Sequence, residues 1–490
     1  DHGPSGRLRF AHIILRDALY EDLSPSDRID WHRAAAEYYA SRTGNSDGLA
    51  SHCETIAHHF QEAGIVDSAL DYWEQAAAIA RSQSAYADAA VRFKQALALL
   101  ADSGLGSRAR VEREIRLRLG LGGALITLEG AGSTDAVPEF RRALELCNLY
   151  PDSPSLFFAV NGVWTYHAMH CNSEAVPLVA RQRELADQLN SQTAHVLASS
   201  AEGTTRFFEG DFNVALAHLE RATGLWLEML QRRVSQGKAG PSLSHTMLSP
   251  LYNAWCLALV GRADEGLELA KHTLAQALDL GTHSHVQALS YISTIYETTG
   301  NYPRLLDVSR QIIEIAEENG YVSWLAIARC TLGKAIARLE DPAAGLAEAE
   351  AGREAYRALG GFLCLTWRQL HLAEMLRLNG RLREAISMVD QTLAASTDRF
   401  EHFADPELYR VRGECALELG EPEGLDWLHR AQRMANSRGA RLFELRASTS
   451  ILEHASDSDV AQRLETLGAE IAGGIGETDR ERVNRALAGL

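Results

Sequence analysis

Residues that bind ligands by stacking or by charge pairing recur about every forty positions through the middle of this chain. Tryptophan and phenylalanine rings would stack on a peptide or a sugar-like ligand, and charged groups would pair with its charges. The candidate pairs are Trp164 and His167, Thr204 and Phe207, Trp255 and Ala258, Thr294 and Glu297, Lys334 and Ala337, and Glu374 and Arg377. Aromatic residues at helical spacing more commonly pack between helices, and this alternative stays open.

Catalytic motifs are absent from the sequence. No GxxxxGKS or GxxxxGKT phosphate loop occurs, because the fragments GKAGPS and LGKAIA lack its second glycine or its order. Neither an HExxH zinc motif nor a GxSxG nucleophile elbow is present. The sequence therefore predicts a chain that is not an enzyme, has no nucleotide site of its own and needs no cofactor.

One short stretch contains several residues of metal-ligand type, namely His52, Cys53, His58 and His59. His52 and His59 could share one face of a helix, but Cys53 and His58 would point elsewhere. We therefore expect these side chains to pack in a helix or face solvent, and we predict no metal site.

Glycines suited to helix ends recur with the same period of about forty residues. The first series is Gly261, Gly300, Gly380 and Gly420, with Glu340 in the missing place, and an in-phase series is Gly281, Gly320, Gly360 and Gly439. A third series of small or apolar residues is Gly266, Leu305, Gly345, Ala385 and Gly424. Each period holds two segments long enough for helices. The sequence predicts an all-α protein, an α-solenoid built from helical hairpins.

Small and aromatic residues indicate the type of hairpin. Near the start of the repeats, the order Ala57, Phe60, Gly64, Ala69, Trp73, Ala76 is the tetratricopeptide pattern of two antiparallel helices joined by a tight turn. In such an array the first helix of each pair lines the concave side. Its tightly packed position is occupied by Val163, Gly203, Ala254, Ser293, Gly333 and Ala373. The next residue and the one three further on turn inward together, which yields the candidate pairs.

The repeats divide the chain into three parts. Residues 1–45 precede the repeats and do not share their period, residues 46–455 form the predicted superhelix, and residues 456–490 are predicted capping helices. The period lengthens across residues 231–245, a stretch rich in glycine, serine and basic residues. We expect a long loop or an extended helix end there, which either contacts a partner or is a tolerated insertion.

Composition limits the classes of partner. The chain has 490 residues and a formal net charge of -17, which disfavours nucleic acid as a direct partner. No apolar run is long enough to cross a membrane, and no signal peptide is apparent, so we expect a cytoplasmic protein. The seven cysteines are scattered singly and are expected to be buried free thiols. A start without methionine suggests an excised fragment.

Several segments resemble a known family. RLRFAHIILRDALYEDLSPSDRIDWHRAAAEYYA resembles the helical or winged-helix region that follows the ATPase module in bacterial signal-transduction ATPases with numerous domains, with matches at Phe10, His12, Tyr20 and His32. GTTRFFEGDFNVALAHLERA, NAWCLALVGRADEGLELA and DPELYRVRGECALELG are similar to the repeats of ATPases fused to adenylate or guanylate cyclase domains. Maltotriose-responsive transcription activators are further relatives. The ATPase, the cyclase and a DNA-binding helix-turn-helix are not present in this chain.

The resemblance implies a sensor and autoinhibitory arm of a larger ATP-dependent bacterial regulator. Such an arm would bind a protein or peptide partner or a small inducer and signal to an ATPase domain that lies upstream, by a population shift between arrangements. The site would lie on the concave face at Trp164, His167, Phe207, Trp255, Glu297, Lys334, Glu374 and Arg377. The alternatives are a stand-alone scaffold for protein partners and a fragment of a transcription activator, with an enzyme a distant third.

Overall fold

The computed structural model describes residues 13–42, 46–130, 132–235, 246–360, 364–396, 399–471 and 475–489. Within these ranges every regular element is a helix and no strand occurs. The predicted all-α class is therefore confirmed. None of the described helices is long and apolar enough to cross a lipid bilayer. Phe10, His12 and most of the predicted insertion, residues 236–245, lie outside the described residues.

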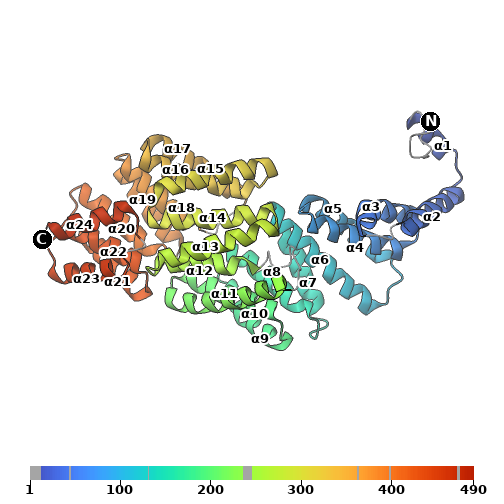
Figure 1. Ribbon diagram of the computed structural model, residues 1–490, viewed down its shortest axis with the longest axis horizontal. Helices are drawn as coiled ribbons and strands as arrows, with labels where there is room; N and C mark the ends of the chain where they lie inside the picture. Colours follow the sequence, from blue (N-terminus) through green and yellow to red (C-terminus); the bar gives the residue numbers. More distant parts are fainter. Residues whose placement is uncertain are drawn as a thin grey trace.

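The chain begins with an arm that projects from a larger curved body (Figure 1). The arm consists of α1 (Ile13–Glu21), α2 (Pro25–Arg42), α3 (Ser46–Glu62), α4 (Val66–Ser82), α5 (Tyr86–Leu99) and the short 3-10 helix η1 (Leu100–Asp102). Two of the residues that carry the family resemblance meet here, because the Tyr20 hydroxyl lies 2.9 Å from Nε2 of His32.

The body is a continuous succession of helices. Its first half contains α6 (Ser107–Glu129), α7 (Ala136–Cys147), α8 (Ser155–Met169), α9 (Ala175–Leu189), α10 (Gln192–Glu209), α11 (Phe212–Ser235), α12 (Leu248–Leu259), α13 (Ala263–Ala277), η3 (Leu278–Leu280) and α14 (Thr282–Thr299). Its second half contains α15 (Tyr302–Asn319), α16 (Val322–Leu339), α17 (Pro342–Ala358), α18 (Leu365–Leu378), α19 (Leu382–Ser396), α20 (Asp405–Glu418), α21 (Gly424–Arg438), α22 (Arg441–Leu452), α23 (Ser458–Glu470) and α24 (Glu477–Ala488).

Helix ends follow the signals in the sequence. Gly300 and Gly320 end α14 and α15 in the left-handed region, with φ of 75° and 70°, as the glycine series predicts. At the start of α17, the side chain of Asp341 accepts a hydrogen bond from the backbone of Ala343, and Pro342 occupies the first turn. These local signals set the helix lengths, and therefore the period.

The helices pair into hairpins whose two members have different neighbours. From α6 to α24 each even-numbered helix packs against the next even-numbered helix, in addition to the odd-numbered helices beside it in sequence. The even-numbered helices therefore form the inner layer of the curve, and the odd-numbered helices from α7 to α23 form the outer layer. This is the arrangement of a tetratricopeptide-like α-solenoid, in which the first helix of each pair lies inside.

Close contact between paired helices depends on the small residues of the series. A Cβ atom added to Gly345 on α17 would overlap the backbone of Gly333 on α16, and one added to Gly266 on α13 would overlap the backbone of Ala254 on α12. The third series of small residues, on the outer helices, therefore faces the tightly packed positions of the inner helices at these two contacts. The register predicted for the inner helices is confirmed at these pairs.

Successive turns of the superhelix touch each other. The hydroxyl of Ser323, at the start of α16, donates a hydrogen bond of 3.1 Å to the carbonyl of Glu129, which is 194 residues earlier. In the same way the backbone N–H of His402 donates to the carbonyl of Phe208 at 2.6 Å. Loops about five repeats apart are thus brought into contact.

The C-terminal helices close the second turn. The N–H of Gly476 donates to the carbonyl of Thr299 at 2.7 Å, and the guanidinium of Arg446 donates to the carbonyl of Thr298 at 2.6 Å. Helix α22 also packs against α12. The segment predicted to cap the array thus docks on the end of α14, in addition to covering the last repeat.

The packing of α16 on α17 generates a stability prediction. Gly345→Ala should lower the free energy of unfolding by about 1–3 kcal/mol, because the added methyl group meets backbone that cannot move aside. Gly123→Ala on α6 is the matched control, since a Cβ there meets nothing within 4 Å and alanine is the better helix former. Thermal melts that rank the two variants equally would contradict this packing.

Candidate functional site: a charged network inside the superhelix

The four charged residues predicted to face inward come together on successive inner helices. Nζ of Lys334 on α16 lies 3.2 Å from a carboxylate oxygen of Glu374 on α18 and 2.6 Å from Nδ1 of His371. Nε2 of His371 lies 3.4 Å from the carboxylate of Glu297 on α14. Arg377, one turn after Glu374, continues the series toward the next helix. The structure thus brings these side chains together, and their role in binding stays a prediction.

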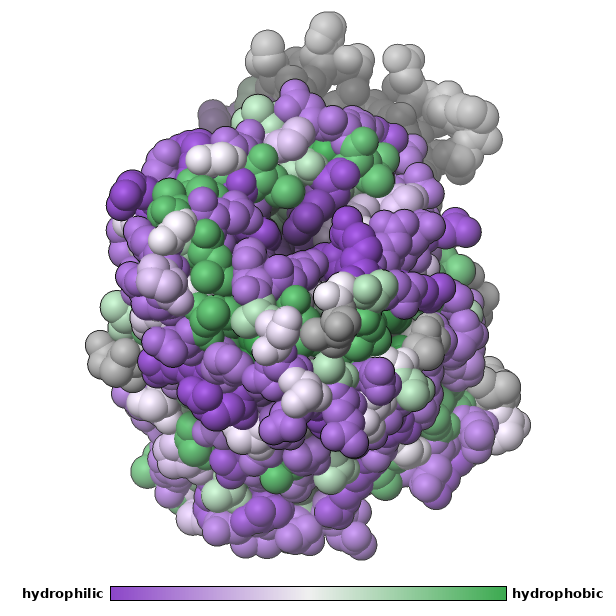
Figure 2. All heavy atoms as spheres, turned by 90° about the vertical axis from the view of Figure 1, so that its left-hand side faces the viewer, coloured by the Kyte–Doolittle hydropathy of each residue, from purple (hydrophilic) through white to green (hydrophobic). Residues whose placement is uncertain are grey.

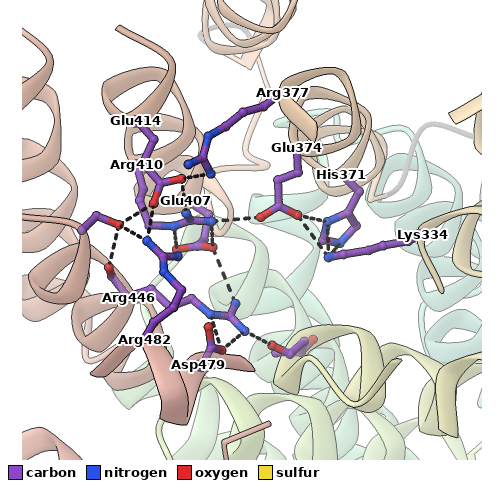
Figure 3. A network of polar contacts seen from close by, with 12 residues as sticks. Lys334, His371, Glu374, Arg377, Glu407, Arg410, Glu414, Arg446, Asp479 and Arg482 are labelled. Atoms are coloured by element: carbon purple, nitrogen blue, oxygen red, sulfur yellow. Dashed lines mark hydrogen bonds and ion pairs between the residues drawn. The ribbon is translucent and has the colours of Figure 1, made fainter. Parts of the chain in front are cut away.

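Helix α20 extends the network. The guanidinium of Arg410 lies 2.9 Å from the carboxylate of Glu374, 2.8 Å from that of Glu407 and 2.9 Å from that of Glu414. Glu414 also pairs with Arg377. Arg410 is therefore the central cation, with carboxylates on two helices around it (Figure 3).

Helices α22 and α24 complete the network from the other side. Arg446 on α22 lies 3.6 Å from Glu407 and 2.6 Å from Asp479 on α24. Arg482 on α24 lies 2.9 Å from Glu414. Figure 3 shows these side chains converging from separate helices. Polar contacts thus run without interruption from α14 to α24.

The ten central charged residues of the network are mostly buried, and their formal charges balance. The relative exposure of Glu414 is 1%, that of Arg410 is 3% and that of Lys334 is 4%. Its cations are Lys334, Arg377, Arg410, Arg446 and Arg482, and its carboxylates are Glu297, Glu374, Glu407, Glu414 and Asp479. Burial of charge is costly unless each group is paired, which these contacts achieve.

The electrostatic surroundings keep the carboxylates ionised. Burial raises the pKa of Glu297, but the charge and hydrogen bond of His371, with Lys334 nearby, outweigh burial and lower the pKa to about 2. Burial likewise opposes ionisation of Glu414, and the charge of Arg410 is the largest effect that holds its pKa well below the usual range. Ionised carboxylates are therefore part of the folded state.

The aromatic candidates Phe207 and Trp255 lie in the core rather than on an open groove. Their relative exposures are 0% and 2%, and their ring centroids are 4.7 Å apart. Phe403, which follows α19 in a non-helical segment, packs 5.2 Å from Phe207 and 5.3 Å from Trp255. The expectation of an accessible aromatic groove is therefore wrong for this conformation, because the segment before α20 fills it. A binding role for either residue stays a prediction.

A tryptophan joins the aromatic cluster to the charged network. The indole N–H of Trp367 on α18 donates to the carboxylate of Glu297 at 2.8 Å, and its ring lies 6.0 Å from that of Trp255. Movement of this ring would therefore affect both groups.

The remaining two candidates, on α8, stand apart from the network. The indole N–H of Trp164 donates to the hydroxyl of Thr205 at 3.3 Å. His167 is buried, and its Nε2 lies 3.2 Å from the carboxylate of Glu174. Burial lowers the pKa of His167 and outweighs the charge of Glu174. These contacts are local to α8, α10 and the start of α9.

Six of the ten charged residues of the network were not predicted from the sequence, namely Glu407, Arg410, Glu414, Arg446, Asp479 and Arg482. One further step of the small-residue series leads from Ala373 to Gly413, and the inward position after it is Glu414. That signal was available in the sequence. No comparable signal marks Arg446, Asp479 or Arg482, because the repeat period fades before α23.

Little room remains around the buried end of the network. A cavity of about 10 Å³ borders Glu297, Arg368 and His371, which is about the space of one water molecule. Among the described residues, no group of three or more His, Cys, Asp or Glu side chains could hold a metal ion. Packed side chains therefore leave little free space beside Glu297 in this conformation.

Removal of the central cation should be strongly destabilising. Arg410→Met leaves the buried carboxylates around it unpaired, and we expect a loss of about 3–5 kcal/mol. Arg412→Met on the same helix is the control, because Arg412 pairs with the half-exposed Asp390 and should cost about 1 kcal/mol. Chemical unfolding measures both, and similar losses would contradict the central role of Arg410.

The network also predicts lability in acid. The folded pKa of Glu297, about 2, lies below the value of about 4.3 expected in the unfolded chain. Its stabilising contribution is therefore present above about pH 4.3 and is lost as the pH falls toward about 2. Between pH 5 and pH 3 the thermal midpoint of Glu297→Gln should fall less than that of the wild type. Equal decreases would contradict the depressed pKa.

Comparisons with known proteins support the fold. No family model matches the chain. An uncharacterized protein of Rhizobium meliloti (strain 1021) is 23% identical over 459 residues, which cover 91% of this chain and 43% of that protein. The chain thus spans less than half the length of this relative.

One solved structure is similar in fold. A Rap protein complexed with Competence and Sporulation Factor has a TM-score of 0.51 at 15% identity, covering 77% of this chain and 99% of its own. At this identity the similarity is one of fold alone, and the fold is a tetratricopeptide-like α-solenoid. NprR in complex with its cognate peptide NprX gives a TM-score of 0.47 at 12% identity, covering 73% of this chain and 99% of its own.

Proposed function

We propose that this solenoid is the sensor and protein-interaction arm of a longer ATP-dependent bacterial signalling regulator, and that the closed superhelix is its resting state. The greater length of the Rhizobium relative and the resemblance of the repeats to those of signal-transduction ATPases support this context. The Rap protein of similar fold was solved with a factor bound, which supports a protein or peptide partner or a small inducer.

The observation that carries the proposal is the buried charged network across α14 to α24. A well-packed apolar interior would stabilise such a fold as well as paired charges do, so stability alone does not account for ten buried or partly buried charged groups. Paired charges favour one specific arrangement of the inner helices, and this arrangement is destabilised when one member loses its partner.

The contacts of Arg446 connect the network to the closure of the superhelix. Its guanidinium binds Asp479 within the C-terminal helices and the carbonyl of Thr298 on the preceding turn. A ligand that competes for the network would therefore weaken the contact between turns. A ligand that binds the open arrangement more tightly than the closed one would shift the population toward the open arrangement. This shift in population is the signal passed to the ATPase.

The network reaches the surface where a partner could engage it. The side chains of Arg377 and Glu418 are 27% and 36% exposed, and those of Arg482 and Glu453 are 19% and 28% exposed. Figure 2 views the end of the molecule that carries the C-terminal helices, and it shows a hollow whose walls are mostly hydrophilic. A partner with charged side chains suits these partly exposed ion pairs better than an apolar one.

The test uses the full-length natural protein that contains this solenoid. We expect its gene to encode a phosphate-binding loop upstream and the protein to hydrolyse ATP slowly in the absence of inducer. Arg446→Ala should raise that rate several-fold, because it removes the contact with Thr298 and with Asp479. Arg441→Ala is the control, since Arg441 pairs only with the exposed Glu470 among the described residues.

Two results would contradict the proposal. One is a full-length protein without any ATP-binding module, which would favour the alternative of a scaffold for protein partners. The other is an ATPase rate that Arg446→Ala leaves unchanged although the variant has lost the contact between turns, as judged by faster amide exchange at Gly476.

A further inference from the structure

A second polar site lies on the outer side of the solenoid, away from the charged network. A cavity of about 210 Å³ opens between α9, α10 and α11. The outer helices α9 and α11 both pack on the inner helix α10, and the small side chains of Ala186 and Ala198 leave space between them. The cavity is smaller than a typical site for a drug-sized molecule, so it suits a small ligand or the end of a chain.

Hydrogen-bond donors without partners line this cavity. Ser199, at the base, has a relative exposure of 9%, and its hydroxyl makes no hydrogen bond within the described part of the chain. His218 and Arg221 are three residues apart on α11 and therefore share a face. Neither has an ion pair or a side-chain hydrogen bond to any residue that the structure describes. Buried polar groups are normally satisfied, so the unpaired hydroxyl of Ser199, in a cavity that the exposed side chain of Arg221 also lines, points to an absent acceptor.

The acidic groups of the cavity are already engaged. The carboxylate of Glu202 accepts a hydrogen bond of 3.1 Å from Arg206 and lies 3.8 Å from Arg183. The carboxylate of Asp187 lies 3.8 Å from Nδ1 of His195. The donors of the cavity that remain unpaired are therefore available to an anion that accepts hydrogen bonds.

We propose that this cavity binds the carboxylate of a small ligand. Arg221 pairs with its charge, and Ser199 and His218 donate hydrogen bonds to its oxygens. Because the whole chain carries a formal charge of -17, anions are not drawn to it by long-range attraction, and recognition depends on these local donors. The carboxylate can come from a free dicarboxylate or from the C-terminus of a peptide. This site is independent of the function proposed for the interior.

Titration calorimetry on the purified chain tests the proposal with three probes. Glutarate represents a free dicarboxylate, Gly-Ala-Leu presents a peptide carboxylate, and Gly-Ala-Leu amide lacks that group. We expect saturable binding of glutarate or of the acid form of the peptide, and no binding of the amide. Glutarate binding assigns the site to small dicarboxylates, and binding of the peptide acid alone assigns it to peptide ends.

The matched variants decide whether binding occurs in this cavity. Arg221→Ala removes an exposed side chain, so the fold is retained, and it should weaken binding about tenfold or more. Arg433→Ala, at an exposed arginine on α21 outside the cavity, should leave binding unchanged. No saturable binding of either carboxylate probe, equal binding of the amide, or equal losses in both variants would overturn the proposal.

Discussion

The inner surface of this solenoid depends on the pairing of buried charges. A carboxylate or guanidinium withdrawn from water must find an opposite charge, and the inner helices supply it both from their own next turn and from the neighbouring inner helix. Lys334 on α16 pairs with Glu374 on α18, which pairs with Arg410 on α20. Because each pair spans two helices, the sequence of charges sets the register of the inner layer as well as its spacing.

The same requirement explains the contact between turns. The chain runs out of repeats after α22, yet Glu407 and Glu414 still face inward and need cations. Arg446 and Arg482, on α22 and α24, supply them, and Arg446 then reaches the carbonyl of Thr298. The C-terminal helices are therefore held inward, against the end of α14 on the preceding turn.

Part of the fold and part of the charged network could be predicted from the sequence. The glycine series predicted the helix ends at Gly300 and Gly320, and Gly333 was assigned to a tightly packed position, where the structure brings it against Gly345. The inward positions derived from it placed Glu297 and Lys334 on one face, because residue spacing along a helix determines direction. These predictions succeeded because each depends only on contacts within one hairpin or between neighbours.

Whether the inner face is open or filled depends on the superhelical pitch, which no local pattern in the sequence encodes. Phe207 and Trp255 were placed correctly on the inner helices, but their burial results from Phe403, which lies about four to five repeats later. A small change in the angle between repeats, summed over one turn, decides whether that segment fills the groove or lies clear of it. Sequence periodicity therefore located the face correctly without showing whether the face is open.

Amide hydrogen exchange tests the closed superhelix most directly. The N–H groups of His402, Phe403 and Gly476 lie outside helices, and their acceptors are carbonyls of Phe208 and Thr299 on the preceding turn. Without contact between turns these amides would exchange as fast as those of an unstructured peptide. The closed arrangement predicts that all three exchange far more slowly, at rates comparable to helical amides of the body. Exchange at the unprotected rate at these positions, with the helices still protected, would contradict it.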